Sequence, residues 1–496
     1  MSPVRRSRGL PAGLPPGFTV ALDRSTRFVD GGRALLGGRP TRLLRLRPRA
    51  RRLLGPGSRT LRVADAAGAA LAEHLLASGL ANPEVCGAGA AVDAPGPEEC
   101  TVVVPVRDRS RSLERLLGSL PPGAPAIVVD DDSERPELLA AVAEKHGARL
   151  LRLPANLGPA GARNAGLREV ATPYAAFVDS DVVLDPAAVG ILLRHFADPK
   201  VVLAAPRIVG LDELMPHRKA AYSGWLVRYE SARSSLDLGP RAAAVRPGTP
   251  VSWVPSACLV ARVEALRGLG GFAAEMRVGE DVDLCWRVDA AGGRIRYEPA
   301  ARAGHDHRAA LSAWFARKAY YGTGAQPLGA RHGGHIAPAA MSPWTAGLVL
   351  ALFAQRRWSA PAAAGLWAVA TWRIARRLRP LDHPVREAVR LSTAGTVSAL
   401  AQGGALLTRH WWPATAVGCA LGSRRVRRAA ALAAVADVAL EYRPGRMRGL
   451  DPVRYAVARR LDDIAYGGGV WLSVLRGRDL TALRPRVVVN GAEKRS

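Results

Sequence analysis

Acidic side chains gather at three places between residues 130 and 281 of the sequence. Asp179 and Asp181 follow the apolar run Tyr174–Val178, with one residue between them. Alternate residues of a strand point to the same side, so both carboxylates are expected to face one point. Such hard oxygen ligands suit a divalent cation bound beside a diphosphate. Most Asp-x-Asp sequences lie in solvated loops. Asp179-Ser180-Asp181 is informative only because two further acidic clusters accompany it.

The other two clusters suit proton transfer and ligand binding. Asp130, Asp131 and Asp132 end the run AIVVDDD, and Glu280 and Asp281 follow Gly279 at the start of an expected helix. Free amides and the helix dipole favour a carboxylate there, which predicts an ionised Asp281 that accepts a proton. The alternative is that Glu280 and Asp281 only cap the helix.

Two histidines, His305 and His307, follow the expected strand RIRYEPA. On one face of the chain they are candidates for a ligand to the same metal or for a donor to phosphate. As isolated histidines they would be ordinary surface residues.

Alternating strands and helices are expected to position these groups. The pattern predicts strands in TVVVPVRDR, AIVVDDDSE and ARLLRLP, helices in SLERLLGSL and ELLAAVAEKHGA, and a Gly-rich turn before a helix and strand over residues 156–178. This order is typical of an α/β fold whose parallel strands carry ligands at their carboxyl ends. A Rossmann dehydrogenase is disfavoured, because PVRDRS stands where GxGxxG would follow the first strand.

Composition narrows the class of protein. A length of 496 residues allows two to four domains, and the net charge of +28 favours anionic partners. The five cysteines are scattered without a CxxC pair, so zinc and a disulfide framework are not expected. No apolar run follows Arg5, Arg6 and Arg8, which predicts a cytoplasmic location.

The first 95 residues form a separate basic segment. Short strands are predicted in FTVALDRSTRFVDGG and RALLGGRPTRLLRLR, and a helix in AAGAALAEHLLASGLA. We expect a small α+β, winged-helix-like domain over residues 1–95 that either recognises a peptide or packs as a cap on the main domain. No clear DNA-recognition helix is present, so nucleic acid is not an expected partner.

The segment 326–496 is Ala-rich, helical in pattern and rich in arginine. Its uncharged stretches His332–Gln355, Leu391–Thr408 and His410–Ser423 are not clean spans of ~20 apolar residues. Arginines border them, which favours helices lying on an anionic membrane surface. A soluble helical appendage over the acceptor site is the alternative.

The motifs VVVPVRDR, IVVDDDS, NLGPAGARNAG, FVDSDV, GGF and GEDVDLCWRVDAAG resemble, in order and spacing, those of family 2 glycosyltransferases. The resemblance covers roughly residues 100–310. It implies a GT-A fold over residues 96–325, which is a Rossmann-like mixed sheet with helices on both faces.

The resemblance also implies roles for individual residues. Asp281, beside Glu280, matches the family's catalytic base, and Asp179 and Asp181 match its metal ligands, with His305 or His307 nearby. The expected nucleotide-sugar site contains Pro105, Arg107, Asp130, Asp132, Asn156, Gly158, Arg163 and Asp179. The resemblance implies that Mn²⁺ or Mg²⁺ is the metal, and that a hexose is transferred with inversion at the anomeric carbon.

The opening 95 residues further resemble a group of these enzymes that adds β-1,4-linked glucose from UDP-glucose to a redox cofactor derived from a peptide. A QxxRW motif of processive synthases is lacking, so the number of sugars stays open, and Arg317-Lys318 with Tyr320–Gly322 are the expected phosphate contacts instead. The alternatives are a glycosyltransferase acting on a lipid-linked cell-wall glycan and a catalytically inactive binding protein.

Overall fold

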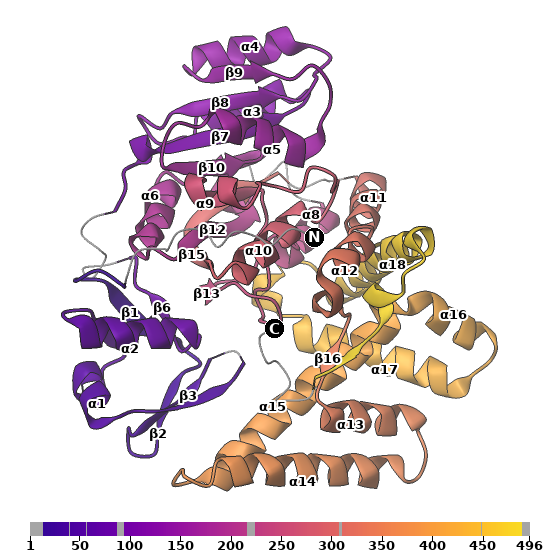
Figure 1. Cartoon of the computed structure of the whole chain (residues 1–496). Helices are drawn as coiled ribbons and strands as arrows, with labels where there is room; N and C mark the ends of the chain where they lie inside the picture. Colours follow the sequence, from indigo (N-terminus) through magenta and orange to yellow (C-terminus); the bar gives the residue numbers. More distant parts are fainter. Residues whose placement is uncertain are drawn as a thin grey trace. The chain divides into compact units, whose positions relative to one another are not determined.

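A computed structural model describes residues 13–38, 40–55, 57–86, 94–215, 224–306, 310–447 and 449–488, leaving out the Arg446 side chain. The chain divides into two compact units. The first comprises Met1–Tyr222 and Arg233–His307, and the second comprises Ser223–Ala232 and Arg308–Ser496. The short segment 223–232 thus leaves the first unit to join the second (Figure 1).

The N-terminal part of the first unit contains two small antiparallel sheets. One has the order β5-β1-β6 and the other β2-β3-β4. The strands are β1 (Thr19–Leu22), β2 (Arg27–Val29), β3 (Ala34–Gly37), β4 (Arg42–Arg45), β5 (Thr60–Arg62) and β6 (Ala81–Pro83). The first four lie in the segments predicted to form strands, while β5 and β6 were not predicted.

Two helices accompany these sheets, α1 (Pro48–Leu54) and α2 (Ala66–Ala77). The predicted helix α2 is confirmed, and it begins where the Asp65 carboxylate accepts a hydrogen bond from the Gly68 amide at 2.7 Å. Its Leu75 and Leu76 are fully buried in the core of this domain. The winged-helix-like description of residues 1–95 stays a prediction.

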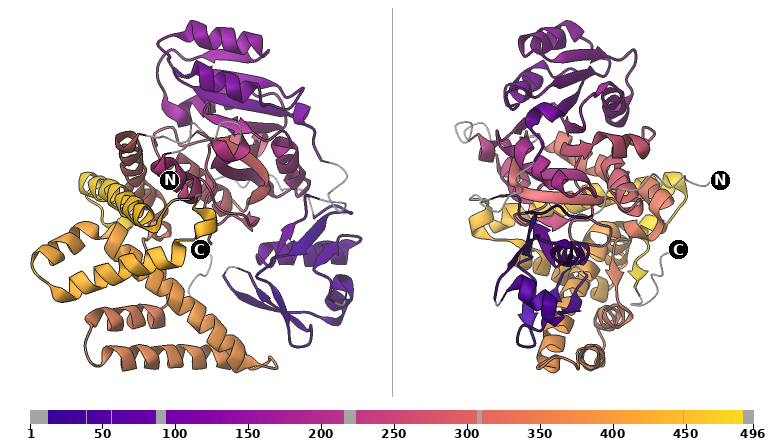
Figure 2. Two further views of the ribbon diagram at one scale, coloured as in Figure 1. Left: turned by 180° about the vertical axis from the view of Figure 1, so that it is seen from behind. Right: turned by 60° about the vertical axis from the view of Figure 1, so that its left-hand side comes forward.

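A nine-stranded mixed sheet forms the centre of the first unit (Figure 2). Its main path runs β11-β15-β12-β14-β10-β7-β8-β9, and β13 pairs with β15. The strands are β7 (Cys100–Val106), β8 (Ala126–Asp130), β9 (Arg149–Arg152), β10 (Tyr174–Val178), β11 (Val182–Leu184), β12 (Val201–Gly210), β13 (Ala243–Ala244), β14 (Cys258–Arg262) and β15 (Arg294–His305). Strands β7 to β10 are mutually parallel, as predicted, and β14 runs antiparallel to β10 and β12.

Helices connect these strands. They are α3 (Ser110–Leu117), α4 (Pro136–Lys145), α5 (Gly158–Glu169), α6 (Ala188–Leu193), α7 (Leu211–Leu214), α9 (Val263–Gly268) and α10 (Glu280–Ala290). The predicted helices α3, α4 and α5 are therefore confirmed. Helix α5 packs closely on the sheet, since a Cβ atom on Gly166 would lie 2.3 Å from a methyl group of Val103.

The second unit is mainly helical, as predicted for the C-terminal region. Its helices are α8 (Trp225–Arg233), α11 (Leu311–Gly322), α12 (Ala325–His332), α13 (Pro343–Ala354), α14 (Ser359–Arg377), α15 (Pro384–Ala405), α16 (Trp412–Ala420), α17 (Arg424–Glu441) and α18 (Pro452–Gly477). The predicted boundary at residue 325 is later than the division in the structure, because α11 packs tightly on α18. A Cβ atom on Gly322 would lie 2.1 Å from the Tyr466 carbonyl oxygen.

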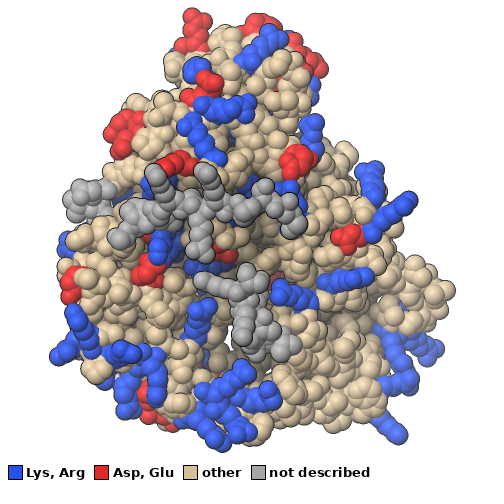
Figure 3. Space-filling model, in the orientation of Figure 1, with Lys and Arg blue, Asp and Glu red and all other residues tan. Residues whose placement is uncertain are grey.

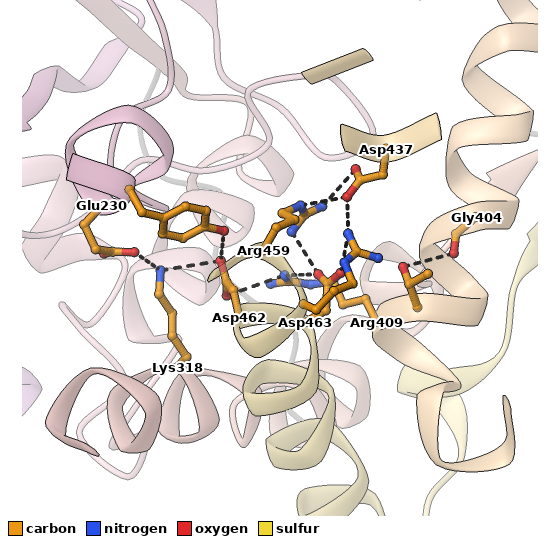
Figure 4. Close-up of polar contacts among 11 residues, drawn as sticks. Glu230, Lys318, Gly404, Arg409, Asp437, Arg459, Asp462 and Asp463 are labelled. Atoms are coloured by element: carbon orange, nitrogen blue, oxygen red, sulfur yellow. Dashed lines mark hydrogen bonds and ion pairs between the residues drawn. The ribbon is translucent and has the colours of Figure 1, made fainter. Parts of the chain in front are cut away.

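A buried ion-pair network ties α8, α11, α17 and α18 together (Figure 4). Lys318 Nζ lies 2.8 Å from Glu230, and the Tyr229 hydroxyl donates to Asp462 at 3.0 Å. Asp463, fully buried, accepts from Arg409 and Arg459 at 3.0 and 2.8 Å. Lys318 is thus engaged inside the helical unit, so the expectation that it contacts phosphate is wrong.

None of the helices in the described part of the chain combines the length and the apolar character needed to cross a membrane.

Candidate active site

Strand register brings the acidic clusters to one edge of the sheet. Val106 pairs with Asp130 across β7 and β8, and Val103 pairs with Phe177 across β7 and β10. The carboxyl ends of these parallel strands therefore meet at the same edge, which is where open α/β sheets bind ligands. Asp130–Asp132 and Asp179–Asp181 follow directly, as the sequence predicts.

The β8 cluster is held by local backbone contacts. Asp130 is fully buried and accepts the Ser133 amide at 3.0 Å, while its other oxygen has no hydrogen bond. Asp132 adopts φ 64°, and its carbonyl accepts from the exposed Arg107 at 3.2 Å. Pro105 stands next to this turn, near the end of β7. These expected nucleotide-sugar residues are therefore neighbours.

Asp131 links the β8 cluster to the Gly-rich turn. Its carboxylate accepts the Leu157 amide at 2.6 Å, and its carbonyl accepts from Asn156 at 3.4 Å. Burial raises the pKa of Asp131 above its usual value, although backbone amides oppose that shift. Gly158 has φ +74°, a left-handed backbone conformation that favours glycine.

Arg163 joins two of the acidic clusters. This buried side chain on α5 donates to Asp179 at 2.6 Å and to Glu280 at 2.9 Å. Burial opposes its charge, but the two carboxylates more than compensate and raise the pKa of Arg163. Its expected place in the nucleotide-sugar site stays a prediction, and the structure shows that its guanidinium bridges Asp179 and Glu280.

The next residue, Asn164, anchors α5 to the GGF loop. Its amide group donates to the Phe272 carbonyl at 2.8 Å and accepts the Phe272 amide at 2.9 Å. These two hydrogen bonds fix the backbone next to Arg163. The Arg163 guanidinium is then held by its own hydrogen bonds to Asp179 and Glu280.

Asp181 lies beside His305 because of the pairing of β11 with β15. Val182 pairs with His305 in that ladder, and His305 Nε2 is 3.6 Å from Asp181 Oδ1. Arg109 donates to the other carboxylate oxygen. Burial would raise the pKa of Asp181, but the charges of His305 and Arg109 outweigh it and lower that pKa. His307 lies outside the described residues.

The expected metal ligands are only partly assembled. Among the described residues, no three His, Cys, Asp or Glu side chains are grouped as a metal centre. Asp181 and His305 stand together, but the Asp179 oxygen nearest Arg163 is committed to that guanidinium. Asp181 is likewise paired with an arginine, Arg109, so the expected set of Asp179, Asp181 and His305 stays a prediction. A carboxylate and an imidazole still fit Mn²⁺ or Mg²⁺ that takes its other ligands from diphosphate and water.

Asp281 occupies the first turn of α10 beside Glu280. Gly279 precedes the helix at φ 84°, and Asp281 accepts the amides of Val282 at 2.8 Å and Ser256 at 3.4 Å. Burial, followed by repulsion from Glu280, raises the pKa of Asp281 to about 7. The expectation that the helix terminus lowers this pKa is wrong, because loss of hydration outweighs the helix dipole and the amide hydrogen bonds.

Two residues of this site were not singled out in the sequence. Arg109 neutralises Asp181, and Ser256 contacts both Glu280, through its hydroxyl at 3.4 Å, and Asp281. The position of Arg109, just after PVRD at the end of a predicted strand, was an available signal. Nothing near Ser256 in the sequence indicated its contacts with residues more than 20 positions later.

Comparisons with known proteins agree with this geometry. Residues 101–245 match the family model for glycosyl transferase family 2, and residues 175–375 match glycosyl transferase family group 2. The chain belongs to the family 2 glycosyltransferases, and its mixed sheet has the predicted GT-A type of fold.

Within that family, one relative is similar along nearly the whole chain. The pre-mycofactocin glycosyltransferase of Mycobacterium tuberculosis is 42% identical over 498 residues, which cover 96% of this chain and 98% of the relative. An uncharacterised glycosyltransferase of Mycobacterium bovis is 31% identical over 39% of this chain and 81% of its own. A mannosyltransferase structure from Pyrobaculum calidifontis, in complex with GDP-Man and Mn²⁺, is 18% identical, covers 75% of this chain and 90% of its own, and has a TM-score of 0.38.

Proposed function

We propose that this glycosyltransferase moves glucose from UDP-glucose to a precursor of mycofactocin, a redox cofactor derived from a peptide, and builds a β-1,4-glucan on it. The relative named pre-mycofactocin glycosyltransferase, which matches almost end to end, supports the acceptor. The chemistry rests on the arrangement of carboxylates around Arg163.

The observation that carries the mechanism is the raised pKa of Asp281, about 7, at the edge of this carboxylate group. A general base works best when its pKa is near the operating pH. Asp281 takes the proton from an acceptor hydroxyl as that oxygen forms a bond to the anomeric carbon. The bond from that carbon to the diphosphate oxygen breaks on the opposite face, which inverts the configuration.

Glu280 and Arg163 act as positioning residues in this scheme. Arg163 shares one positive charge between Glu280 and Asp179, and Glu280 lies beside Asp281 in the first turn of α10. Its negative charge keeps the Asp281 proton affinity high. A neutral Glu280 would make Asp281 a weaker base.

The donor lies, in this proposal, along the turns after β7 and β8. Asp130 and Asp132 bind the uridine, and Pro105, Arg107, Asn156 and Gly158 border it. Asp181 and His305, which lie side by side, and Asp179 are the residues that would hold Mn²⁺ or Mg²⁺. A divalent cation supplies charge neutralisation for the departing nucleoside diphosphate.

The N-terminal domain is the proposed site for the peptide-derived part of the acceptor. It docks on the GT-A domain through Glu73 of α2, which accepts from Lys200 at 2.7 Å and from Arg294. Arg246 also donates to the Ala77 carbonyl at the end of α2, at 2.8 Å. The contacts hold the domain beside the sheet that carries the active site.

The helical unit is the proposed membrane-associated part. Residues 343–441 contain thirteen arginines and four carboxylates. Figure 3 shows Lys and Arg side chains protruding where Figure 1 places α14 to α17, with few acidic ones. Apolar side chains are exposed on the same helices, including Leu432 at 65% and Val435 at 67% on α17. Such a mixture suits an anionic lipid surface.

Mass spectrometry tests the proposal. The enzyme is incubated with Mn²⁺, the mycofactocin precursor and UDP-glucose, with GDP-mannose as the competing donor. Additions of hexose from UDP-glucose alone are expected, and their number reports the length of the glucan. Transfer from GDP-mannose alone would contradict the donor.

A lipid-linked cell-wall glycan is the second candidate acceptor, favoured by the exposed apolar helices. Slow hydrolysis of UDP-glucose without transfer to the precursor would favour this alternative. Absence of both transfer and hydrolysis would contradict the catalytic assignment itself.

A further inference from the structure

Helices α13, α14 and α15 of the helical unit enclose a cavity of about 350 Å³. This volume falls within the ~300–1,000 Å³ of known small-molecule sites. All the residues that line the cavity belong to the helical unit, and none of them is assigned to sugar transfer. Its apolar walls include Trp344, Leu348, Leu366, Trp367, Ile374 and Leu391.

The two serines that line the cavity, Ser342 and Ser392, already have hydrogen-bond partners. Ser392 is bonded to Thr371 at 2.7 Å and donates to the Val389 carbonyl at 3.1 Å. Ser342 accepts the Thr345 amide at 3.3 Å. Because these groups are satisfied, a polar ligand gains little inside, and the interior favours a hydrocarbon.

Two arginines give the cavity a charged side. Arg373 and Arg377, one turn apart on α14, both line it and are exposed to solvent. The Arg373 guanidinium lies 5.1 Å from the Trp344 ring centre. In the described part of the chain neither arginine forms an ion pair with a carboxylate. An apolar interior beside two unpaired cations matches a hydrocarbon chain that carries an anionic head.

The outer side of α14 indicates where such a molecule comes from. Trp372 is 56% exposed, and the Arg376 guanidinium lies 4.9 Å from its ring centre. Val369 and Trp358 are also exposed on or beside this helix. Indole and guanidinium groups suit the headgroup layer of a bilayer, with apolar neighbours in contact with acyl chains.

We propose that the α13–α15 cavity binds one acyl chain of an anionic phospholipid from the membrane, with Arg373 and Arg377 contacting its phosphate. The inference rests on the proposed membrane association of the helical unit. A bound lipid chain would make the attachment of the helical unit selective for one kind of lipid. Surface charge alone does not, because nonspecific electrostatic attraction depends only on the net charge of the membrane surface.

Gly395 offers a direct test. It lines the cavity, and a Cβ atom there would meet no atom within 4 Å, so Gly395→Leu fills the cavity without a backbone clash. Gly365→Leu is the matched control, since Gly365 on α14 also faces open space but does not line the cavity. Both variants place the same side chain in a helix.

The full-length protein is incubated with phosphatidylglycerol or phosphatidylcholine vesicles and recovered by flotation. The protein is then separated from the vesicles, and the number of lipid molecules that remain bound to it is measured by native mass spectrometry. We expect one phosphatidylglycerol per chain and about tenfold less retention in Gly395→Leu, while Gly365→Leu behaves as the parent. Both variants still float, because the surface helices are unchanged.

A second pair of variants tests the head-group site. Arg373→Gln with Arg377→Gln is compared with Arg376→Gln plus Arg390→Gln, which removes equal charge outside the cavity. Only the first pair is expected to abolish the preference for phosphatidylglycerol in retained lipid. Equal losses in both pairs would overturn the assignment of the phosphate to Arg373 and Arg377.

The outcomes separate the cavity from the surface. Flotation with undiminished lipid retention in Gly395→Leu would overturn the cavity site and leave surface association alone. Binding of monomeric lysophosphatidylglycerol without flotation would support the cavity and contradict the membrane association. If the protein neither floats with the vesicles nor binds lipid, both the cavity site and the membrane association are overturned. None of these measurements depends on sugar transfer.

Discussion

Asp281 shows how a single carboxylate responds to its surroundings at the residue scale. In the first turn of α10 the helix dipole favours its charged form. Burial and the neighbouring Glu280 act in the opposite direction and raise its pKa to about 7. Asp281 is therefore half protonated near neutral pH, which suits a base that must also release its proton after transfer.

The transfer rate is expected to depend on this protonation. Because the base acts only when deprotonated, kcat/KM should rise about tenfold per pH unit below 7 and level off above it. Asp281→Asn should lower kcat by about 10²- to 10⁴-fold and leave UDP binding nearly intact. Asp382→Asn, an exposed aspartate outside this site, serves as the control. A flat profile between pH 5.5 and 8 in the parent enzyme would contradict the assignment.

Arg163 carries the second prediction at this scale. Arg163→Met leaves Asp179 and the buried Glu280 without their shared cation, which should cost about 3–5 kcal/mol of unfolding free energy. Arg168→Met, on an exposed position of the same helix, should change it by less than about 0.5 kcal/mol. Urea denaturation of both variants measures the difference. Equal stability of the two would show that the carboxylates need no bridge.

At the element scale, the helical unit depends on how closely two helices approach. Where helices α11 and α18 cross, glycines of each helix lie against the backbone of the other helix. A Cβ on Gly322 would lie 2.1 Å from the Tyr466 carbonyl oxygen, and one on Gly469 would lie 1.9 Å from the Ala319 carbonyl oxygen. Close approach at this crossing lets Lys318 of α11 reach Asp462 of α18, 3.9 Å away.

A single methyl group should therefore disturb this crossing. Gly322→Ala is expected to lower the unfolding free energy by about 1–3 kcal/mol, since the backbone atoms opposite cannot yield as a side chain would. Gly365→Ala, in open space on α14, should instead raise it by about 0.5–1 kcal/mol through better helix propensity. Thermal unfolding of the two variants should shift in opposite directions. A stabilising Gly322→Ala would refute the close crossing.

At the scale of the whole molecule, the first unit joins a small N-terminal domain to a GT-A domain through few charged contacts. Glu73 of α2 lies between Lys200 and the buried Arg294, which also donates to the buried Asp198 at 2.6 Å. Burial opposes the charge of Glu73, but the two cations lower its pKa below the usual value. Glu73 is therefore charged at neutral pH and holds the two domains together.

Removing this contact should loosen the N-terminal domain. Glu73→Gln keeps the shape but loses the charge, and hydrogen exchange in α2 and β6 is expected to quicken about tenfold. The KM for the peptide-derived acceptor should rise, while hydrolysis of UDP-glucose stays unchanged. Glu137→Gln, exposed on α4, is the control. Unchanged exchange would mean that other contacts suffice for docking.

The sequence by itself determined the order of the motifs and those helices and strands whose apolar residues recur at a regular spacing. Strands β7 to β10 and helices α2 to α5 were predictable, since apolar runs, turns and caps are local properties of the chain. The motif order also sufficed for the family. The sequence likewise indicated that the acidic clusters follow strand ends.

Only the tertiary structure decided how those residues meet. The β11–β15 register brings His305 to Asp181, and Arg163 reaches Glu280 across 117 positions of the chain. Burial of Asp281 reversed the pKa shift that its helix position suggested, and Lys318 proved to be buried beside Glu230. Ion pairing and loss of hydration depend on segments distant in sequence, and local patterns carry no information about them.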